Sequence, residues 1–427
     1  MKSIILSTLI IILASCSSTQ VISTPNLILK EGKAPFLNHD ELPETKIFYI
    51  TDRQKSTTEN EFYSNQRSYQ LKYGKARIQV HKDSKQELYN LLTFNKKKGD
   101  LKVDVTSVDE LGTFPDTAKS HFYMTQGQFA KGFEASQKNF IKQINEGLKG
   151  KSKKDIYLFV HGYNNAFNYA ATRIAQLWFF MGHQGLPMLY SWPAGQEGLF
   201  GYFADKESGE FSILNLKKTL EMLAKTDVEN IHLIAHSRGT EISLSALREL
   251  HIKYSAMNIK TKEALKLTNL ILAAPDIDID IFKMRFVGEN IMQVAKHVTI
   301  YLGQGDKALK LSTYVHKSLS RLGIIKPEDV PESSATVIKN MKNVDLIYVP
   351  FKINFLNHSY FLDNPAVSSD IILLLRDDVK AGHDKRPLEK HKSGIWLIHE
   401  TYPLEKKVTS SERNVRNYRL SHEFMTN

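Results

Sequence analysis

Short runs of consecutive apolar residues recur through the middle of the chain, and amphipathic stretches with helical spacing separate them. Continuous apolar runs are typical of strands that are buried on both faces of a sheet. The predicted buried strands are residues 156–160, 188–192, 231–234, 270–274, 298–302 and 346–349. The predicted helices are residues 129–148, 170–181, 213–224 and 366–375. This alternation predicts an α/β fold, with a mostly parallel sheet that carries helices on both faces.

The ends of the chain show a different pattern. Near the N-terminus, shorter segments alternate between apolar and polar residues, which predicts a β-containing N-terminal extension of the sheet. These strands are expected at residues 46–51, 76–81 and 101–108. Residues 380–392 are charged and predict a linker, and the segment around Trp396 reads as an appended piece. We therefore expect the main α/β domain at residues 46–378 and a C-terminal extension at residues 379–427.

The first residues predict a targeting segment. A short basic start is followed by an apolar stretch at residues 4–13, which is too short to span a bilayer as a stable anchor. Residues 13–16 (LASC) then resemble the lipobox of a bacterial lipoprotein signal peptide, which implies cleavage before Cys16 and lipidation of that residue. We expect a signal peptide at residues 1–15 and a tether at residues 16–45. The protein would then be lipid-anchored in the bacterial cell envelope, at the outer membrane or the periplasmic face rather than the inner membrane.

The composition of the chain limits the kinds of partner that we expect it to bind. The chain carries 57 Lys and Arg against 46 Asp and Glu, a net charge of +11 that suits an anionic surface such as membrane headgroups. The lysines are scattered without interleaved aromatic residues, so we expect no nucleic-acid partner. Because Cys16 is the only cysteine, the chain can form no internal disulfide and has no other thiol for catalysis or metal binding. Neither metal-ligand spacing nor a Gly-rich phosphate loop occurs, so we expect no metal and no cofactor.

The segment Ala235-His236-Ser237-Arg238-Gly239 carries the clearest chemical signal. It follows the apolar run at residues 231–234 and precedes a helical pattern over residues 242–250. A strand, a sharp turn with serine at its apex and a helix form the nucleophile elbow of α/β-hydrolases. Small residues two positions before and after the serine let the strand and the helix pack closely. The pattern predicts Ser237 as a catalytic nucleophile.

A serine nucleophile needs a histidine base and an acid that orients the base, and in α/β-hydrolases these follow in the order Ser, acid, His. Two acids qualify, since Asp276 follows the first predicted strand after the serine and Asp306 follows the second. The strand count favours Asp306, with Asp276 as the alternative. The predicted base is His358, in a loop beyond the last sheet strand, and His399 is its rival.

The oxyanion formed during acyl transfer needs two backbone N–H donors. One is expected from Arg238, directly after the nucleophile. The other is expected from the loop His161-Gly162-Tyr163-Asn164, which follows an early buried strand. We expect Tyr163 to be this second donor, with Asn164 as the alternative. Asp205 and Glu207 are expected to form structural salt links, for which Arg173 is a candidate partner.

Taken together, these segments resemble the uncharacterised α/β-hydrolase family of bacterial esterase-like and lipase-like proteins known as DUF900. The matching segments are residues 48–53, 159–164, 190–193, 201–208, 235–239, 273–276, 305–309 and 358–361. The family usually shows Met after the nucleophile, whereas this chain has Arg238, which we expect to add a cation near the mouth of the site. The resemblance implies hydrolase chemistry and supplies no substrate.

These observations predict a membrane-anchored serine hydrolase that cleaves a small-molecule or lipid ester through an acyl-enzyme intermediate. Two alternatives stay open. An envelope-tethered binding module could keep the hydrolase fold without turnover, although the presence of all three triad residue types in the right order argues against it. An acyltransferase would use the same elbow and differ only in the group that accepts the acyl chain.

Overall fold

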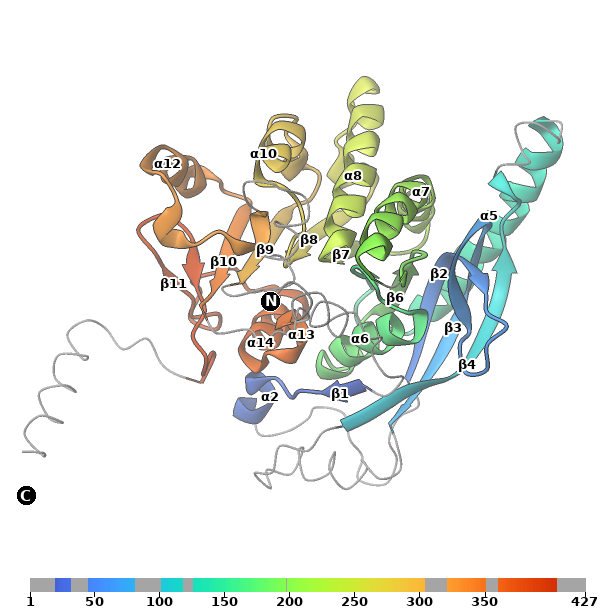
Figure 1. Ribbon diagram of the computed structural model, residues 1–427, viewed down its shortest axis with the longest axis horizontal. Helices are drawn as coiled ribbons and strands as arrows, with labels where there is room; N and C mark the ends of the chain where they lie inside the picture. The colour runs from blue at the N-terminus through green and yellow to red at the C-terminus, as the bar shows by residue number, and fades with distance from the viewer. Residues whose placement is uncertain are drawn as a thin grey trace, which may run out of the picture.

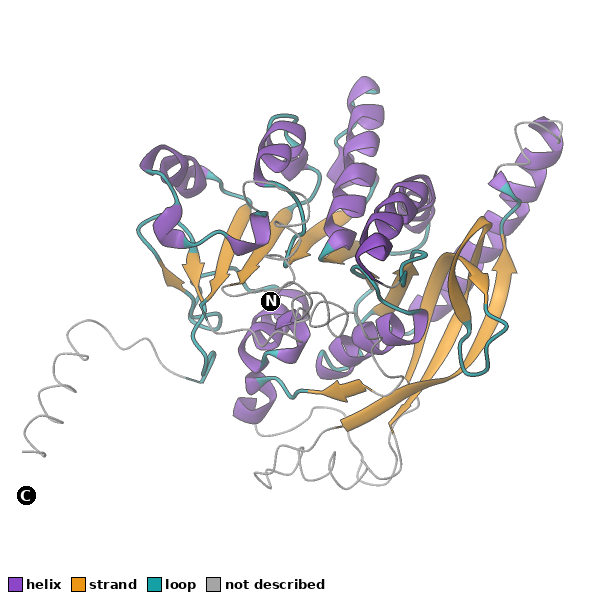
Figure 2. Ribbon diagram, in the orientation of Figure 1, coloured by secondary structure: helices purple, strands orange, loops and turns teal. Residues whose placement is uncertain are grey.

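The computed structural model describes residues 20–31, 45–80, 101–117, 126–196, 198–303, 321–350 and 360–404. Within these residues one sheet runs through the molecule (Figures 1 and 2). Its strands are β1 (Gln20–Ile22), β2 (Thr45–Lys55), β3 (Tyr63–Val80), β4 (Leu101–Thr113), β5 (Asp155–Val160), β6 (Leu186–Ser191), β7 (Asn230–His236), β8 (Leu267–Ala273), β9 (His297–Gly303), β10 (Val344–Val349), β11 (Glu389–Lys390) and β12 (Trp396–Leu397). Their order across the sheet is β1-β4-β3-β2-β6-β5-β7-β8-β9-β10-β12-β11.

Helices connect these strands. The longer ones are α5 (Gln126–Leu148), α6 (Phe167–Phe180), α7 (Gly198–Ala224), α8 (Arg238–Ala256), α12 (Glu332–Asn340) and α14 (Pro365–Asp377). The shorter ones are α2 (Asn26–Glu31), α9 (Thr261–Ala264), α10 (Ile279–Ile281), η2 (Phe282–Val287), η3 (Ile291–Gln293), η4 (Leu322–Ile324), η5 (Pro327–Asp329) and α13 (Tyr360–Asp363). The expected helix at residues 213–224 begins earlier, at Gly198, so residues 198–212 are helical as well.

The centre of the sheet is parallel, as predicted. Every pair of neighbours from β2 to β10 runs parallel, whereas β3, β4 and β1 add an antiparallel N-terminal part. Long connections return the chain to the same sheet edge, so the carboxyl ends of the parallel strands lie side by side. The predicted α/β fold with an N-terminal β-containing extension is therefore confirmed.

Two apolar layers hold the helices to the sheet (Figure 2). Successive side chains of β7 point to opposite faces of the sheet. Leu233 packs into the layer under α5, α7 and α8, whereas Ile234 packs into the layer under α6 and α14. Both side chains are fully buried. A strand that is buried on both faces must be apolar throughout, which is why the sequence shows unbroken hydrophobic runs here.

The described part of the expected C-terminal extension adds edge strands to the sheet. β12 pairs in parallel with β10, and β11 pairs antiparallel with β12. Within the charged stretch expected to be a linker, the guanidinium of Arg386 is fully buried and donates to both carboxylate oxygens of Asp370 at 2.8 Å. The expected signal peptide and Cys16 lie outside the described residues. Among the described helices, none is long and apolar enough to cross a membrane.

Candidate active site

Ser237 lies at the turn between β7 and α8, at the carboxyl edge of the sheet, with φ 52° and ψ −122°. A positive φ is costly for a serine and persists only where the surroundings hold it. Its N–H donates to Ala273 O at 3.0 Å, and its carbonyl accepts from Thr240 N at 3.0 Å and Thr240 Oγ1 at 2.6 Å. The strand, the strained turn and the helix expected around the serine are all present.

Two glycines bring the loop after β5 against this turn. A Cβ on Gly239 would lie 2.4 Å from His161 O and 2.6 Å from Val160 O, which are backbone atoms that have little room to move. A Cβ on Gly162 would lie 2.8 Å from the Cβ of Ser237. Glycine is therefore required at both positions, and the loop expected to supply an oxyanion donor touches the serine.

Asp205 ties this loop in place. Its buried carboxylate accepts from Asn164 N at 2.9 Å, from Gly195 N at 3.1 Å and from Gln196 N at 3.2 Å. Burial raises the pKa of the Asp205 carboxyl, while these three N–H groups and Arg53 oppose the rise. Asp205 thus joins α7 to the loops after β5 and β6.

The prediction of a salt link between Asp205 and Arg173 is wrong. Arg173 pairs instead with Asp363 at 2.7 Å. Sequence reasoning therefore missed the role of Asp205, although residues 201–208 were among the family-like segments.

Arg53 and His161 form a second brace on the same loop. Arg53 is buried and donates through Nη2 to Asn165 O at 2.6 Å and through Nε to Ser191 Oγ at 2.9 Å. His161 Nδ1 lies 3.0 Å from Gly162 O, and its ring stacks on Trp192 with centroids 5.2 Å apart. Burial, with a further contribution from Arg53, lowers the pKa of His161 well below its ordinary value. His161 is thus neutral, donating from Nδ1 and accepting at Nε2 from the Arg53 side.

The sequence led us to expect that Arg238 adds a cation near the mouth of the site. This prediction is wrong, because Arg238 is buried. Its side chain is only 3% exposed. The guanidinium donates to Glu241 Oε2 at 2.6 Å and to the hydroxyl of Tyr202, and it lies over the Tyr202 ring at 4.6 Å. Burial alone would lower the pKa of Arg238, but Asp276, Tyr202 and Glu241 together raise it above its ordinary value. Its charge is neutralised inside the protein.

Asp276, the alternative acid, belongs to the same cluster. Its carboxylate accepts from Tyr202 OH at 2.6 Å and lies 3.4 Å from both Arg238 Nη2 and Arg321 Nε. Its N–H points back to Ser237 O at 3.4 Å. Asp276 therefore adjoins the nucleophile turn, with its carboxylate set between two arginines and a tyrosine.

Asp306 and His358 lie outside the described residues, but their neighbours along the chain are placed. β9 ends at Gly303, and this residue pairs with Val349 at the end of β10. Three residues after His358, the Phe361 ring stacks on His236 with centroids 4.7 Å apart. His399, the rival base, is half exposed and lies 3.1 Å from Glu389. It follows β12, which is four strand spacings from β7, or about 19 Å across the sheet.

The family is shown by a family model described as "Alpha/beta hydrolase of unknown function (DUF900)", which matches residues 136–376. That match covers more than half of the chain and runs from within α5 into the last turn of α14, with the whole nucleophile turn. This chain belongs to the DUF900 family. The family expected from the sequence is thereby confirmed, and with it a hydrolase-type fold. No curated relative matches the chain.

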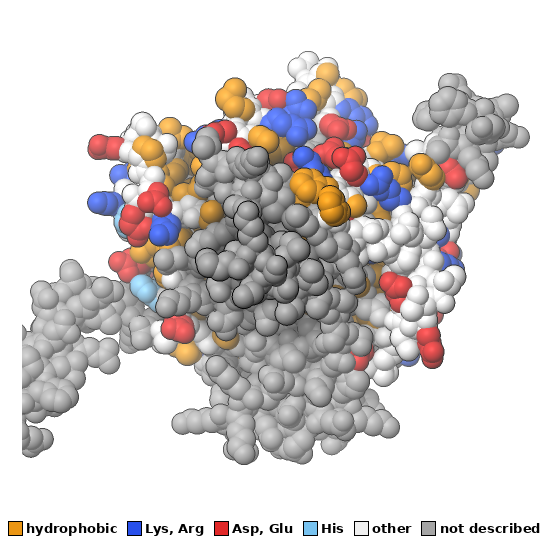
Figure 3. Space-filling view, viewed as in Figure 1, with side chains coloured by type: hydrophobic (Ala, Val, Ile, Leu, Met, Phe, Trp, Pro, Cys, Tyr) orange, Lys and Arg blue, Asp and Glu red, His pale blue; other side chains and the backbone are white. Residues whose placement is uncertain are grey.

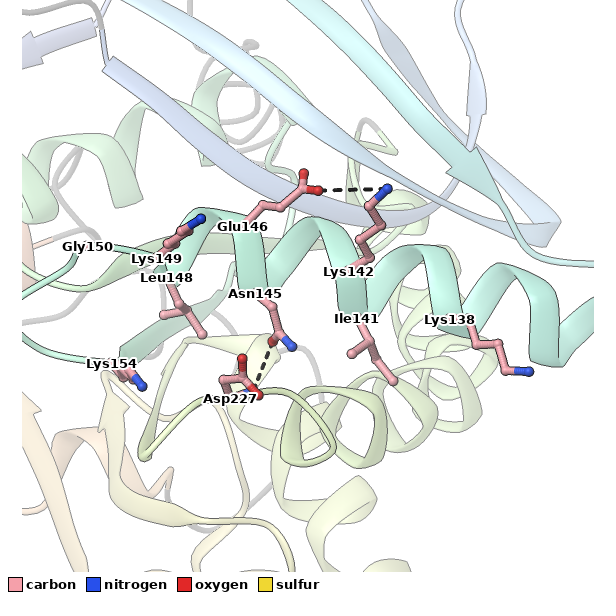
Figure 4. Close-up of a pocket in the computed structure, with 10 residues that line it drawn as sticks. All are labelled: Lys138, Ile141, Lys142, Asn145, Glu146, Leu148, Lys149, Gly150, Lys154 and Asp227. Atoms are coloured by element: carbon pink, nitrogen blue, oxygen red, sulfur yellow. Dashed lines mark hydrogen bonds and ion pairs between the residues drawn. The ribbon is translucent and has the colours of Figure 1, made fainter.

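The DUF900 protein also carries a basic hollow of about 720 Å³ along α5 (Figure 4). Four lysines line it: Lys138, Lys142, Lys149 and Lys154. Lys154 directly precedes β5 and Asp227 lies shortly before β7, so the hollow is at the amino ends of the parallel strands. Ser237 is at the opposite, carboxyl edge, where α/β sheets carry their ligand sites. The hollow is therefore separate from the nucleophile turn.

Proposed function

We propose that this protein is a serine hydrolase that cleaves a carboxylic ester through an acyl-enzyme intermediate, with Ser237 as nucleophile. One observation carries the proposal: Ser237 holds a strained positive-φ conformation at the carboxyl end of a central parallel strand and at the start of a helix. Backbone strain of this kind clusters at functional sites, because it aims a side chain in a direction that an ordinary turn does not allow.

In this proposal the backbone stabilises the oxyanion. The Arg238 N–H lies at the first turn of α8, where the helix dipole favours negative charge. Tyr163 N–H is the second donor. The Asn164 N–H already donates to Asp205 at 2.9 Å, which favours Tyr163 over the alternative. Two preorganised donors on braced loops stabilise charge that develops only in the transition state.

His358 is the proposed base. Phe361 is three positions after His358, about 10 Å away at most when the chain is fully extended, and its ring lies on the residue before Ser237. The distance of β12 from β7 argues against His399. Asp306 is the proposed acid because it follows β9, whereas the Asp276 carboxylate already faces Arg238 and Arg321.

The reaction then follows from these roles. His358 takes the proton of Ser237 as Oγ attacks the ester carbonyl, and the proton passes to the leaving alcohol as the ester bond breaks. A water molecule, deprotonated by His358, attacks the acyl-enzyme in turn. When the carboxylic acid is released, His358 returns this proton to Ser237 Oγ.

We also propose that Cys16 is lipidated and anchors the protein in the cell envelope. The support is the lipobox-like segment at residues 13–16, and the positive charge of +11 suits an anionic membrane surface. Labelling of growing cells with a palmitate analogue tests this directly. The wild-type protein should be labelled and pellet with membranes, whereas Cys16→Ala should lose the label.

Hydrolysis of p-nitrophenyl acetate and butyrate tests the proposed function. Ser237→Ala should abolish turnover and leave the circular dichroism spectrum unchanged. The matched control is Ser255→Ala, an exposed serine near the end of the same helix, which should keep full activity. Turnover by Ser237→Ala equal to that of the control would overturn the assignment.

A further inference from the structure

A second cavity, of about 280 Å³, lies between the sheet and the segments that follow β8 and β9. Its floor is formed by Ile300 and Leu302 of β9 and by Val344 and Leu346 of β10. Side chains of η2 and α12 cover it, Phe282 and Ile338 among them. Nearly all of the lining is aliphatic or aromatic, and the charged lining residues Lys283 and Asp329 are exposed to solvent. The interior is therefore apolar and the charges belong to its rim.

Backbone hydrogen bonds connect the lining of the cavity to the nucleophile turn through the segment after β8. Leu322 lines it, and the Leu322 N–H donates to Ile277 O at 2.8 Å. The adjacent Asp276 N–H lies 3.4 Å from Ser237 O. The floor of the cavity runs along β9 and β10 towards the amino edge of the sheet. Leu302 lies near the carboxyl end of β9, and Val344 is the first residue of β10. An extended chain entering at the serine would lie along these strands.

The segments over the cavity also leave apolar side chains in solvent. Between β8 and β9 the chain forms only short pieces, including the π-helix η2, a conformation found often at functional sites. Ile281 is 45% exposed, Met284 78% and Val337 54%. Hydrophobic side chains reach the surface on the side of the molecule that carries α10 and α12 (Figure 3). Exposed apolar side chains beside an apolar cavity are typical of a binding site rather than of a closed core.

We propose that this cavity binds the hydrocarbon chain of the acyl group, so that the substrate is an ester of a medium-chain or long-chain fatty acid. This inference rests on the proposed role of Ser237. Each buried methylene adds to the free energy of binding, so a chain that fills the cavity binds far more tightly than an acetyl group. The described lining of the cavity has no buried charged side chain that could bind a polar ligand, so the occupant is expected to be a hydrocarbon.

Filling the cavity tests this. Ile338→Trp places an indole in the cavity from α12, and Val337→Trp narrows the rim from a half-exposed position that tolerates a large side chain. The matched control is Thr336→Trp, which puts the same side chain on the solvent face of α12. Both cavity variants should lower kcat/KM for p-nitrophenyl octanoate about tenfold or more, and leave the acetate ester within about twofold. The control should match the wild type for both esters.

Binding of a dansylated undecanoic acid separates the two proposals, because it needs no turnover. The Ser237→Ala protein should bind this probe, and adding Ile338→Trp or Val337→Trp should weaken binding about tenfold or more. If binding behaves in this way but no ester is cleaved, the cavity is a site for a hydrocarbon chain, and the hydrolase proposal fails together with the ester substrate. If acetate is cleaved while the cavity variants change neither chain-length preference nor probe binding, the cavity inference is overturned and the hydrolase proposal stands.

Discussion

The Phe361 ring stacks on the imidazole of His236, with centroids 4.7 Å apart and an interplanar angle of 28°. The same ring packs on Phe159 of β5 at 5.9 Å. Phe361 is 1% exposed, so the start of α13 is fixed against the ends of β5 and β7. This contact links the chain segment that carries the proposed base to the residue directly before the proposed nucleophile.

Weakening this contact should therefore affect catalysis more than substrate binding. Phe361→Leu keeps an apolar side chain but removes the stack, and we expect kcat to fall about tenfold with little change in KM, because small misplacements of a base are costly. Steady-state kinetics with p-nitrophenyl butyrate measures this. The control is Phe179→Leu, since Phe179 of α6 makes edge-to-face ring contacts with Phe180 and His183 instead. Equal kcat values for the two variants would contradict the proposed position of His358.

Asp205→Asn tests whether the loop after β5 needs its carboxylate brace. The amide keeps the size but cannot accept from Asn164, Gly195 and Gln196 together without placing an NH₂ group against a donor. We expect kcat to fall by about tenfold to a hundredfold, which is less than the loss of about 10²–10³ when an oxyanion donor is removed outright. The exposed Glu207→Gln of the same segment should have no effect. If Asp205→Asn changed KM alone, the loop would act in substrate binding instead.

The two candidate acids predict opposite outcomes. Asp306→Asn should lower kcat by about 10⁴, as expected when the base loses its orienting acid, with little change in Tm. Asp276→Asn should lower the free energy of unfolding by about 3 kcal/mol, because Arg238 and Arg321 would stay buried beside a neutral group. Thermal unfolding and kinetics on both variants decide the matter. A larger loss of kcat in Asp276→Asn would make Asp276 the acid.

His161 should make the fold sensitive to mild acid. Its pKa is lowered well below the ordinary value of 6.5 by burial and by Arg53, so the unfolded chain binds a proton that the native protein refuses. The contribution of His161 to the free energy of unfolding is fully present above the pKa that it has in the unfolded chain. This contribution is lost as the pH falls below that pKa. The slope contributed is at most about 1.36 kcal/mol per pH unit.

Urea unfolding at a series of pH values below neutrality measures this slope. His161→Asn should show a shallower loss of stability with falling pH than the wild type. The exposed His399→Asn should follow the wild-type profile. Identical slopes for the wild type and His161→Asn would contradict a neutral, buried His161.

The parts of this fold that follow from periodicity could be predicted from the sequence. The unbroken apolar runs placed the central parallel strands, and the small residues around Ser237 placed the sharp turn. Residues 52–55 and 63–72 were not among the predicted strands, yet they form the end of β2 and the first part of β3. Antiparallel strands outside the central sheet can leave one face in solvent, so their polar residues do not exclude a strand.

Polar contacts between distant elements could not be predicted in this way. Arg238 looked like a surface cation because its charge is visible in the sequence. Glu241 lies one turn further along α8, but the second anionic partner, Asp276, follows a different strand, β8. Arg386 stands in a charged stretch, yet Asp370 of α14 pairs with it in the interior. Such pairs have no periodic signature, so only the fold brings them together.

The proposed function depends on Ser237 being an activated nucleophile. A fluorophosphonate probe followed by peptide mass spectrometry tests this most directly, since such probes react with serines that an adjacent base activates. We expect one labelled peptide in the wild type, modified at Ser237, and no label in Ser237→Ala or in heat-unfolded protein. A folded wild-type protein that takes up no label, or that is labelled equally in Ser237→Ala, would contradict it.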